Sequence, residues 1–209
     1  MKQFSFRLSL FAGIAVGAGC LVNLSCDNRY MGALLFTVGL FFILTTGSQL
    51  FTGVCAFSGY RLLPILGGNL LGIVLITLPS GLWNPALAQK ALAAWEKPLS
   101  MGWPLCLVNG LCCGMMMYLA VRTWRKYQEK QPLFAFAGLM FAIPCFILSG
   151  FVHCIALWGY GVLAVGAFPD ALSALRHLGL GLLTLVPIIA SNFLGSRLTR
   201  LLIDPTPAV

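Results

Sequence analysis

A single histidine stands inside a long apolar stretch, close to a glycine that would interrupt a helix. His153 lies between Leu148 and Ala156, beside Gly150. From Pro132 to Phe168 the other titrating side chains are cysteine thiols and Tyr160. An ionisable group inside a membrane-spanning segment is costly, so it marks a functional site by default. The imidazole, which titrates near ~6.5 when unperturbed, could exchange a proton with a weak-acid anion or donate a hydrogen bond to it. The alternative is a hydrogen bond that only packs two helices together.

A second polar interruption occurs in an earlier apolar run. The segment Thr45–Gln49 contains Gly47 and precedes Leu50–Gly53. Helices in lipid tolerate such breaks only where protein or water satisfies the backbone groups. We therefore expect two discontinuous helices. The N-terminal N–H groups near Gln49–Thr52 and Gly150–His153 would offer partial positive charge to an anion.

These breaks belong to a chain with the composition of an integral membrane protein. Of its 209 residues, 59% are hydrophobic and 9% are charged, against roughly 25% charged residues in soluble domains. Six apolar runs are each long enough for the about 20 helical residues that cross a bilayer. They are Leu8–Leu24, Met31–Phe57, Leu62–Pro79, Met101–Val121, Leu133–Ala167 and Leu178–Leu202. The sequence predicts an all-α membrane protein with six transmembrane helices.

The net charge of +8 would suggest nucleic acid in a soluble protein, but here the positions of the cations indicate topology, and no nucleic-acid partner is expected. With six spans both termini share one side of the membrane. Nine cations fall on that side: Lys2, Arg7, Arg61, Arg122, Arg125, Lys126, Lys130, Arg197 and Arg200. Four fall on the other: Arg29, Lys90, Lys97 and Arg176. The positive-inside rule then predicts cytoplasmic termini, with membrane lipid as a partner.

The two halves of the chain carry similar patterns. Each half reads as a glycine-rich helix, a broken helix and an asparagine-containing helix, and Ile188–Gly195 echoes Ile65–Gly72. Three spans per unit give the two units opposite membrane orientations. We therefore expect a single transmembrane domain, residues 1–209, built as an inverted repeat with halves at about 1–96 and 97–209. Such repeats place a site near the midplane between the two broken helices.

Two further predictions concern the connectors and the fourth span. Trp83, Trp95 and Trp103 are expected as anchors at the membrane interface, and the alanine-rich segment Pro85–Trp95 as a surface helix. Asn109 is expected as a buried amide in the fourth span.

Other classes of protein are less well supported by the residues. The eight cysteines lie mostly in apolar runs without a C-x-x-C pair, so no metal site or cofactor is expected. A membrane redox protein would have to bind haem with His153 and His177, and a thiol enzyme would need Cys154 to face its chain neighbour His153, which adjacent helical residues do not do. A channel for neutral solutes such as water or ammonia is the main alternative, although paired Asn-Pro-Ala boxes are absent.

The chain resembles the formate/nitrite transporter family over essentially its whole length. The resemblance rests on Gly47 with Leu50-Phe51-Thr52, Gly68-Asn69 with Gly72, Asn109 with Cys112 or Cys113, Ser149-Gly150-Phe151 with His153 and Ile155-Ala156, and Pro187 to Asn192 with Gly195. It implies an aquaporin-like protomer of six helices, broken in the second and fifth, in a homopentamer with one anion path per protomer. The implied substrate is formate, nitrite or hydrosulfide, the implied location is the prokaryotic plasma membrane, and no enzyme activity is implied.

The resemblance also implies roles for particular residues. His153, Thr52, Asn109 and Lys97 would belong to the substrate path, with Lys97 in the outer vestibule. Leu40, Phe51 and Cys112 would form an inner constriction, and Phe36 and Phe146 an outer one. Two positions differ from the family pattern, Val152 in place of a glutamate and Leu157 in place of an asparagine. Both differences bear on gating and substrate choice.

Overall fold

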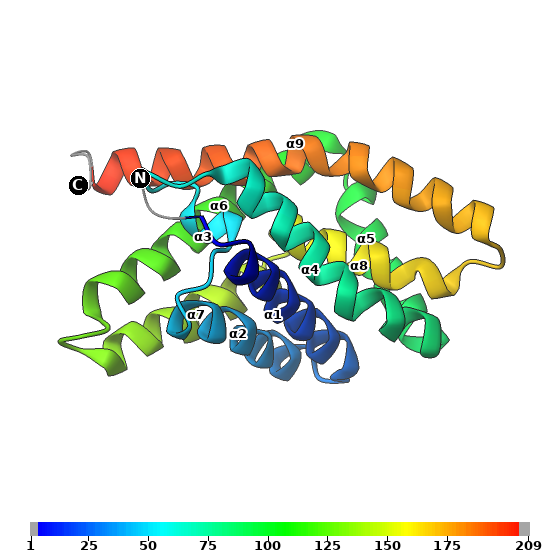
Figure 1. Cartoon of the computed structure of the whole chain (residues 1–209), viewed down its shortest axis with the longest axis horizontal. Coiled ribbons are helices and arrows are strands. Elements are labelled where there is room, and N and C mark those ends of the chain that lie inside the picture. The colour runs from blue at the N-terminus through cyan, green and yellow to red at the C-terminus, as the bar shows by residue number, and fades with distance from the viewer. Residues whose placement is uncertain (1–3, 205–209) are drawn as a thin grey trace.

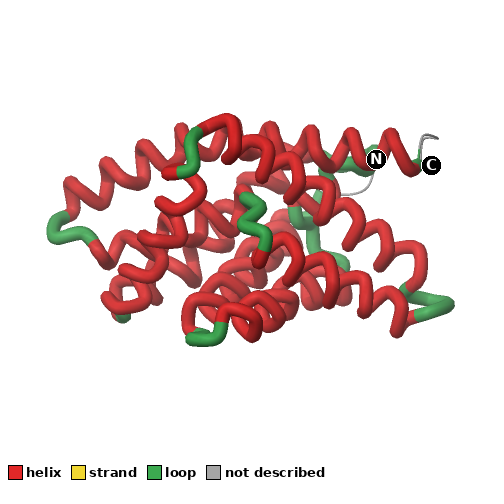
Figure 2. Tube along the Cα trace, turned by 180° about the vertical axis from the view of Figure 1, so that it is seen from behind, coloured by secondary structure: helices red, strands yellow, loops and turns green. Residues whose placement is uncertain are grey.

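The computed structural model describes residues 4–204, and within that range the chain forms helices and no strands. In chain order the helices are α1 (Phe6–Ser25), α2 (Arg29–Thr45), α3 (Phe51–Val54), α4 (Leu62–Trp83), α5 (Pro85–Ser100), α6 (Trp103–Tyr127), α7 (Pro132–Leu148), α8 (Cys154–Leu163), a 3-10 turn (Ala164–Ala167) and α9 (Ala171–Ile203). Figure 1 shows α9 along one edge of the molecule, over nearly its whole length. Short loops join the helices (Figure 2).

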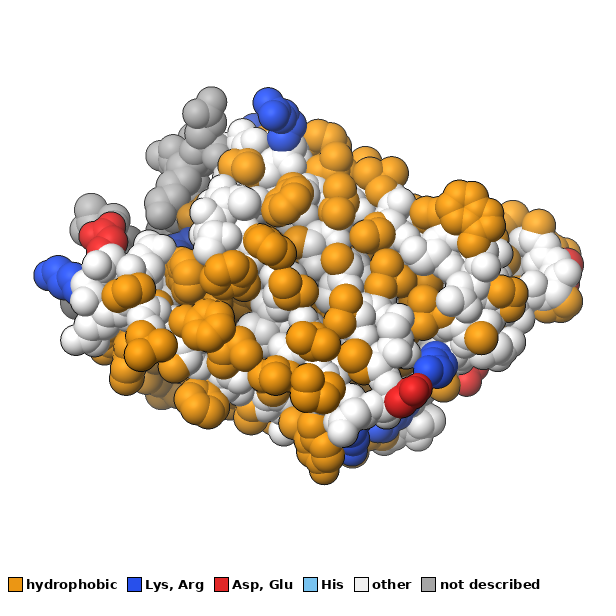
Figure 3. Space-filling model, turned by 90° about the horizontal axis from the view of Figure 1, so that it is seen from below, with side chains coloured by type: hydrophobic (Ala, Val, Ile, Leu, Met, Phe, Trp, Pro, Cys, Tyr) orange, Lys and Arg blue, Asp and Glu red, His pale blue; other side chains and the backbone are white. Residues whose placement is uncertain are grey.

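Four of these helices, α1, α4, α6 and α9, are long and apolar enough to cross a membrane, and α2, α7 and α8 are shorter apolar helices. The outer surface is apolar as well: Leu63, Leu133 and Leu202 are 79%, 80% and 82% exposed. Figure 3 shows hydrophobic side chains over most of one face, with the visible charged groups at its margins. A soluble monomer rarely exposes so much contiguous apolar surface. The protein is therefore a multi-pass membrane protein.

Glycines bring the long helices into backbone contact. Gly72 of α4 faces a backbone carbonyl of α1, and Gly13 of α1 faces one of α4. Gly195 of α9 and Gly114 of α6 make the same reciprocal approach. At each of the four positions a Cβ would collide with the facing backbone. Because lipid tails compete with apolar side chains, such close packing is a main source of helix association in membranes.

Two apolar segments are interrupted where the sequence predicts. α2 ends at Thr45 and α3 begins at Phe51, while α7 ends at Leu148 and α8 begins at Cys154. Each gap contains a glycine in the left-handed region, Gly47 with φ 67° and Gly150 with φ 75°. A side chain at such a φ would strain the backbone, so glycine is needed there.

The expectation that Trp95 anchors the chain at the membrane interface is wrong. Trp95 is 5% exposed, and its ring lies 5.4 Å from that of His177, with Gly161 directly beside it. The alanine-rich helix α5 is therefore not simply a surface helix. It buries Ala88, Ala91 and Trp95 against α8 and the 3-10 turn, because its small residues permit a close approach.

Candidate functional site

The first interruption is held in place by one buried asparagine of α4. The Oδ1 atom of Asn69 accepts a hydrogen bond from the backbone N–H of Phe51 at 2.7 Å. Its Nδ2 donates to the carbonyl oxygens of Gln49 and Ser9, both at 2.8 Å. The side chain thus pairs backbone groups before and after Leu50. Backbone groups at a break would otherwise be unsatisfied in an apolar core.

An asparagine of α9 does the same at the second interruption. Asn192 Oδ1 accepts from the N–H of Cys154 at 2.9 Å. Its Nδ2 donates to the carbonyls of Val152 at 2.8 Å and Gly110 at 2.9 Å. Asn69 and Asn192 are both fully buried. The residue between the two paired groups is Leu50 in the first break and His153 in the second.

His153 and Thr52 meet between these two breaks. The Nε2 atom of His153 lies 2.7 Å from Thr52 Oγ1, and both residues are buried. His153 also caps α8, because its Nδ1 accepts from the N–H of Ala156 at 3.1 Å. Nδ1 therefore carries no proton, and in the neutral ring the proton sits on Nε2. The imidazole then donates to the Thr52 hydroxyl.

A cavity of about 460 Å³ leads to His153. The residues that line it include Asn23, Arg29, Phe36, Ala94, Lys97, Met101, Phe146, Phe151, His153, Leu157 and Tyr160. Two are exposed cations, Arg29 at the start of α2 and Lys97 in the last turn of α5, and no described lining residue is acidic. We call this space the cationic cavity. It runs from exposed charged groups to the buried histidine, so it would attract anions.

Arg29 is a site residue that the sequence analysis did not single out. Its Nη2 donates to the carbonyl of Leu148, the last residue of α7, at 3.0 Å. The Arg29 guanidinium thus satisfies a carbonyl at the end of α7 and also contributes positive charge to the cationic cavity. The signal in the sequence was weak, since a lone arginine at the start of an apolar run reads first as a topology marker.

Two aromatic rings line the cationic cavity beside the histidine. Phe36 and Phe146 pack edge to face with ring centroids 6.1 Å apart, and both line the cavity. The Phe146 ring is also 6.0 Å from the His153 ring. Phe36 is 5% and Phe146 3% exposed. The pair therefore forms a buried aromatic wall of the cavity next to His153.

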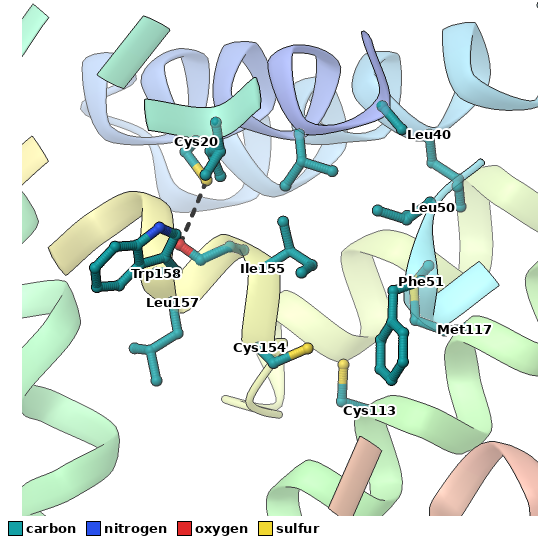
Figure 4. Packing of buried hydrophobic residues seen from close by; sticks show 14 of the residues in the cluster. Cys20, Leu40, Leu50, Phe51, Cys113, Met117, Cys154, Ile155, Leu157 and Trp158 are labelled. Carbon is teal, nitrogen blue, oxygen red and sulfur yellow. Dashed lines mark hydrogen bonds between the residues drawn. The ribbon is translucent and has the colours of Figure 1, made fainter. Parts of the chain in front are cut away.

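The other residues expected along the path lie in different surroundings. Leu40 and Phe51 belong to the buried apolar cluster, where the Phe51 ring lies toward Met117 and Cys113 (Figure 4). Cys112 is half-buried and outside that cluster, whereas Cys113 is inside it. Asn109 is half-buried rather than buried, and it reaches the second break through its carbonyl, which accepts from the N–H of Val152 at 3.2 Å.

Helix dipoles contribute less partial positive charge to the two breaks than the sequence suggests. α3 comprises only four residues, so few peptide dipoles are aligned at its start. α8 is longer, and its first turn is capped by His153. Partial positive charge from a helix N-terminus is therefore available at the second break alone.

Arginines at the far ends of α6 and α9 hold the loop that follows α3. Arg200 is 8% exposed and donates to the carbonyl of Ala56 at 2.5 Å. Arg125 lies 3.9 Å above the centre of the Phe57 ring and donates to the Tyr60 hydroxyl at 2.9 Å. These contacts fix the segment that carries Phe51 and Thr52.

An ion pair closes the same end of the molecule. Both Nε and Nη2 of Arg122 donate to the carboxylate of Asp204, and the Tyr118 hydroxyl donates to it at 2.5 Å. Chiefly because of the hydrogen bonds from Arg122, the pKa of Asp204 is lowered from 3.8 to about 2. The carboxylate is thus ionised at any physiological pH.

Comparison with known proteins identifies the family to which this arrangement belongs. A family model described as formate/nitrite transporter matches residues 3–203. The chain belongs to this family. The resemblance inferred from the residues is therefore confirmed, and membership agrees with the prediction of a transport protein rather than an enzyme.

The relatives found by sequence and by structure are channels. The formate channel FocB of Escherichia coli (strain K12) is 27% identical over 185 residues. That match covers 74% of this chain and 64% of the relative, less than two thirds of its length. A solved pentameric formate channel with formate bound superposes with a TM-score of 0.75 at 23% identity, covering 92% of both chains. A solved FNT family ion channel gives 0.73 at 21% identity, covering 97% of this chain and 90% of the other. The structural likeness supports the fold.

Proposed function

We propose that this family member conducts small monovalent anions of the formate, nitrite or hydrosulfide type through a path within each protomer. The observation that carries the proposal is the Thr52–His153 pair, buried beyond a cavity with two cations and no acidic lining residue among those described. A transported anion would enter past Arg29 and Lys97, pass Phe36 and Phe146, and reach the two hydrogen-bonding groups. It would leave between Leu40 and Phe51, with Cys112 and Asn109 nearby.

The proposed architecture is six membrane spans in two inverted halves, residues 1–96 and 97–209, within one domain. In this reading α2 with α3 and α7 with α8 are the broken spans. The matching hydrogen bonds of Asn69 and Asn192 support it, because each asparagine pairs the backbone on both sides of one break. The reciprocal glycine contacts of α1 with α4 and of α6 with α9 support it as well.

The chemistry proposed for the centre is stabilisation of a dehydrated anion. An ion that leaves water for an apolar interior loses several kcal/mol unless donors replace its hydration. The hydroxyl of Thr52, and the Nε2–H of His153 once it is released from Thr52, would supply such donors, and the capped start of α8 adds partial positive charge. A second proton on the ring requires Nδ1 to give up the Ala156 N–H. We therefore propose that His153 is neutral at rest and takes this proton only when an anion compensates the charge.

The phenylalanine and leucine side chains would exclude water and hydrated ions from this centre. Hydrophobic constrictions gate by dewetting, since water gains too few hydrogen bonds inside them. Phe36 and Phe146 would act on the side of the cationic cavity, and Leu40 and Phe51 on the opposite side.

We further propose a homopentamer in a prokaryotic plasma membrane with both termini in the cytoplasm. The contacts of the cations support the orientation. Arg29 and Lys97 share the cationic cavity, and Lys90 pairs with Asp27 at 3.5 Å. At the other end, Arg61 approaches the Phe4 ring and Arg125 the Phe57 ring. A cysteine placed at Lys90 should react with an impermeant thiol reagent in intact cells, in a background without reactive native cysteines. Reaction only after the membrane is opened would reverse the orientation.

Anion flux into proteoliposomes tests the proposed function. Purified protein should carry formate, nitrite and hydrosulfide down their gradients and leave glycerol behind, and Thr52→Val with His153→Asn should abolish the anion flux while the pentamer persists. Glycerol or water permeation without anion flux would support a neutral-solute channel instead and refute the proposal.

A further inference from the structure

The cationic cavity is much larger than the ions proposed to pass through it. Its volume of about 460 Å³ equals about 15 water molecules at the roughly 30 Å³ that each takes in the liquid. Formate, nitrite and hydrosulfide have three heavy atoms or fewer, so any of them would fill only a small part of this space. Cavities of roughly 300–1,000 Å³ are the size that holds organic ligands.

The walls of the cavity separate charge from apolar surface. Arg29 and Lys97 are exposed, whereas Phe146 and Leu157 are only 3% exposed. Phe151, Met101 and the Tyr160 ring add further apolar lining. The Tyr160 hydroxyl is already engaged, because it accepts from Asn23 Nδ2 at 3.0 Å. A ligand with one anionic group and an apolar body would therefore meet cations at the rim and apolar walls inside.

The two cations keep donors for such a ligand. Arg29 uses Nη2 to hold the Leu148 carbonyl, and a guanidinium has five N–H donors in all. The Lys97 ammonium forms no hydrogen bond or ion pair with the described residues. Among the described residues that line the cavity, none is acidic. A carboxylate fits both groups, since charge-assisted hydrogen bonds from arginine and lysine are short and strong.

We infer that the cationic cavity is also a binding site for larger monocarboxylates with an aromatic or medium-length aliphatic body, which block the path instead of passing through it. The carboxylate binds at Arg29 and Lys97 and the body lies along the apolar wall. The ligand fills the cavity beside the buried Phe36–Phe146 pair, whose ring centroids are 6.1 Å apart edge to face, and so covers the approach to His153, which lines the same cavity. This inference rests on the proposed function, because block presupposes an anion path.

Binding and flux are measured separately, so that the two proposals can fail independently. Full-length protein in lipid nanodiscs is titrated with 4-phenylbutyrate and with its neutral amide. The carboxylate should bind and the amide should not. Arg29→Gln and Lys97→Gln should each weaken binding by roughly threefold to tenfold. Lys90→Gln is the matched control, since Lys90 is a cation on the same side that does not line the cavity, and it should bind like the wild type.

A second variant tests the role of the cavity volume. Ala94 is half-buried in the wall, and Ala94→Phe would fill part of the space without removing charge. It should abolish binding of 4-phenylbutyrate. In flux assays 4-phenylbutyrate should slow formate uptake only when it is added on the side where the cationic cavity opens.

The outcomes separate the two ideas. Three results would refute the binding site. They are equal binding of the acid and the amide, unchanged binding after both cations are replaced, and unchanged binding by Ala94→Phe. Wild-type protein that carries formate but binds no 4-phenylbutyrate overturns the inference alone. Wild-type protein that carries no anion overturns the proposed function, whatever the titration gives.

Discussion

Asn69 and Asn192 make equivalent sets of three hydrogen bonds at two chain breaks that lie in different halves of the sequence. Each side-chain oxygen accepts from the first helical N–H after its break, and each side-chain nitrogen donates to the carbonyl two residues before that N–H and to a carbonyl of a neighbouring helix. The backbone is paired in the same way around Leu50 and around His153. The chemistry differs because one position carries an apolar side chain and the other an imidazole.

Replacing either asparagine should therefore destabilise the protein strongly. Asn69→Ala and Asn192→Ala each leave buried N–H and C=O groups unpaired, at about 1–3 kcal/mol per group. The control is Asn84→Ala, which removes one exposed cap bond, to the N–H of Leu87, and should cost about 1 kcal/mol. In detergent, the unfolding temperatures of Asn69→Ala and Asn192→Ala should be well below that of the control. Equal losses in all three would mean that the buried amides do not hold the breaks.

The Thr52 hydroxyl should matter for transport rather than for folding. Thr52→Val keeps the shape but removes the partner of His153, so anion flux should fall on the order of 100- to 1,000-fold, as when one donor is lost from a charge-stabilising site. Thr37→Val is the matched control, since Thr37 Oγ1 is buried and makes no hydrogen bond within the described residues. That variant should carry anions at the wild-type rate. Similar flux in both variants would remove Thr52 from the path.

The proton at His153 should be visible as a pH dependence. If the ring takes a second proton as an anion arrives, flux of a weak-acid anion should rise as external pH falls from about 8 toward 6, because the supply of protons to the ring increases. His153→Asn keeps a side-chain donor and can still cap α8, but it cannot titrate. Uptake measured across the pH series should then be flat. A mutant that retains the full response would leave His153 only a hydrogen-bonding or packing role.

The phenylalanine pair should set the size limit of the path. Phe146→Ala or Phe36→Ala opens the space between the rings, so leak of larger anions such as acetate or lactate should increase while the protein still assembles. Phe146→Leu, which preserves more volume, should show a smaller increase. Phe141→Ala on the same helix serves as the control, because Phe141 is 77% exposed. Relative permeabilities from proteoliposome uptake provide the measurement, and an unchanged cutoff would exclude these rings as the constriction. The same test applies to Phe51→Ala on the opposite side.

The Arg122–Asp204 pair should contribute stability that changes only at acidic pH. The pKa of Asp204 is depressed to about 2 from 3.8, so its contribution is present above about pH 4 and is lost as pH falls through the folded value. Asp204→Asn should lower the unfolding temperature equally at pH 7 and pH 5, and by less at pH 3. Asp27→Asn is the control, with a side chain 99% exposed. If the loss of unfolding temperature in Asp204→Asn differed between pH 5 and pH 7, the lowered pKa of Asp204 would be contradicted.

The class of protein and the interruptions in its apolar helices could be predicted from the residues alone, and the central residues of the path remain a prediction. Apolar runs and their interruptions can be recognised locally, because a bilayer requires helices of a minimum length and tolerates breaks only where protein or water satisfies the backbone groups. Gly47 and Gly150 marked both breaks, and His153 stood out because the other titrating side chains between Pro132 and Phe168 are cysteine thiols and Tyr160. The family resemblance added Thr52, Phe36 and Phe146, all of which lie at or beside the site.

Tertiary structure decided the contacts that join distant segments. Whether Trp95 faces lipid or the interior depends on which helix covers it, and neither composition nor periodicity contains that information. From the sequence alone, Arg29 and Arg200 are both interpreted as topology markers. The structure shows instead that Arg29 bonds to the carbonyl of Leu148 and Arg200 to the carbonyl of Ala56. The tautomer of His153 follows from the Ala156 N–H that its Nδ1 accepts. Each of these depends on the position of one backbone atom, which is fixed only when all the helices pack together.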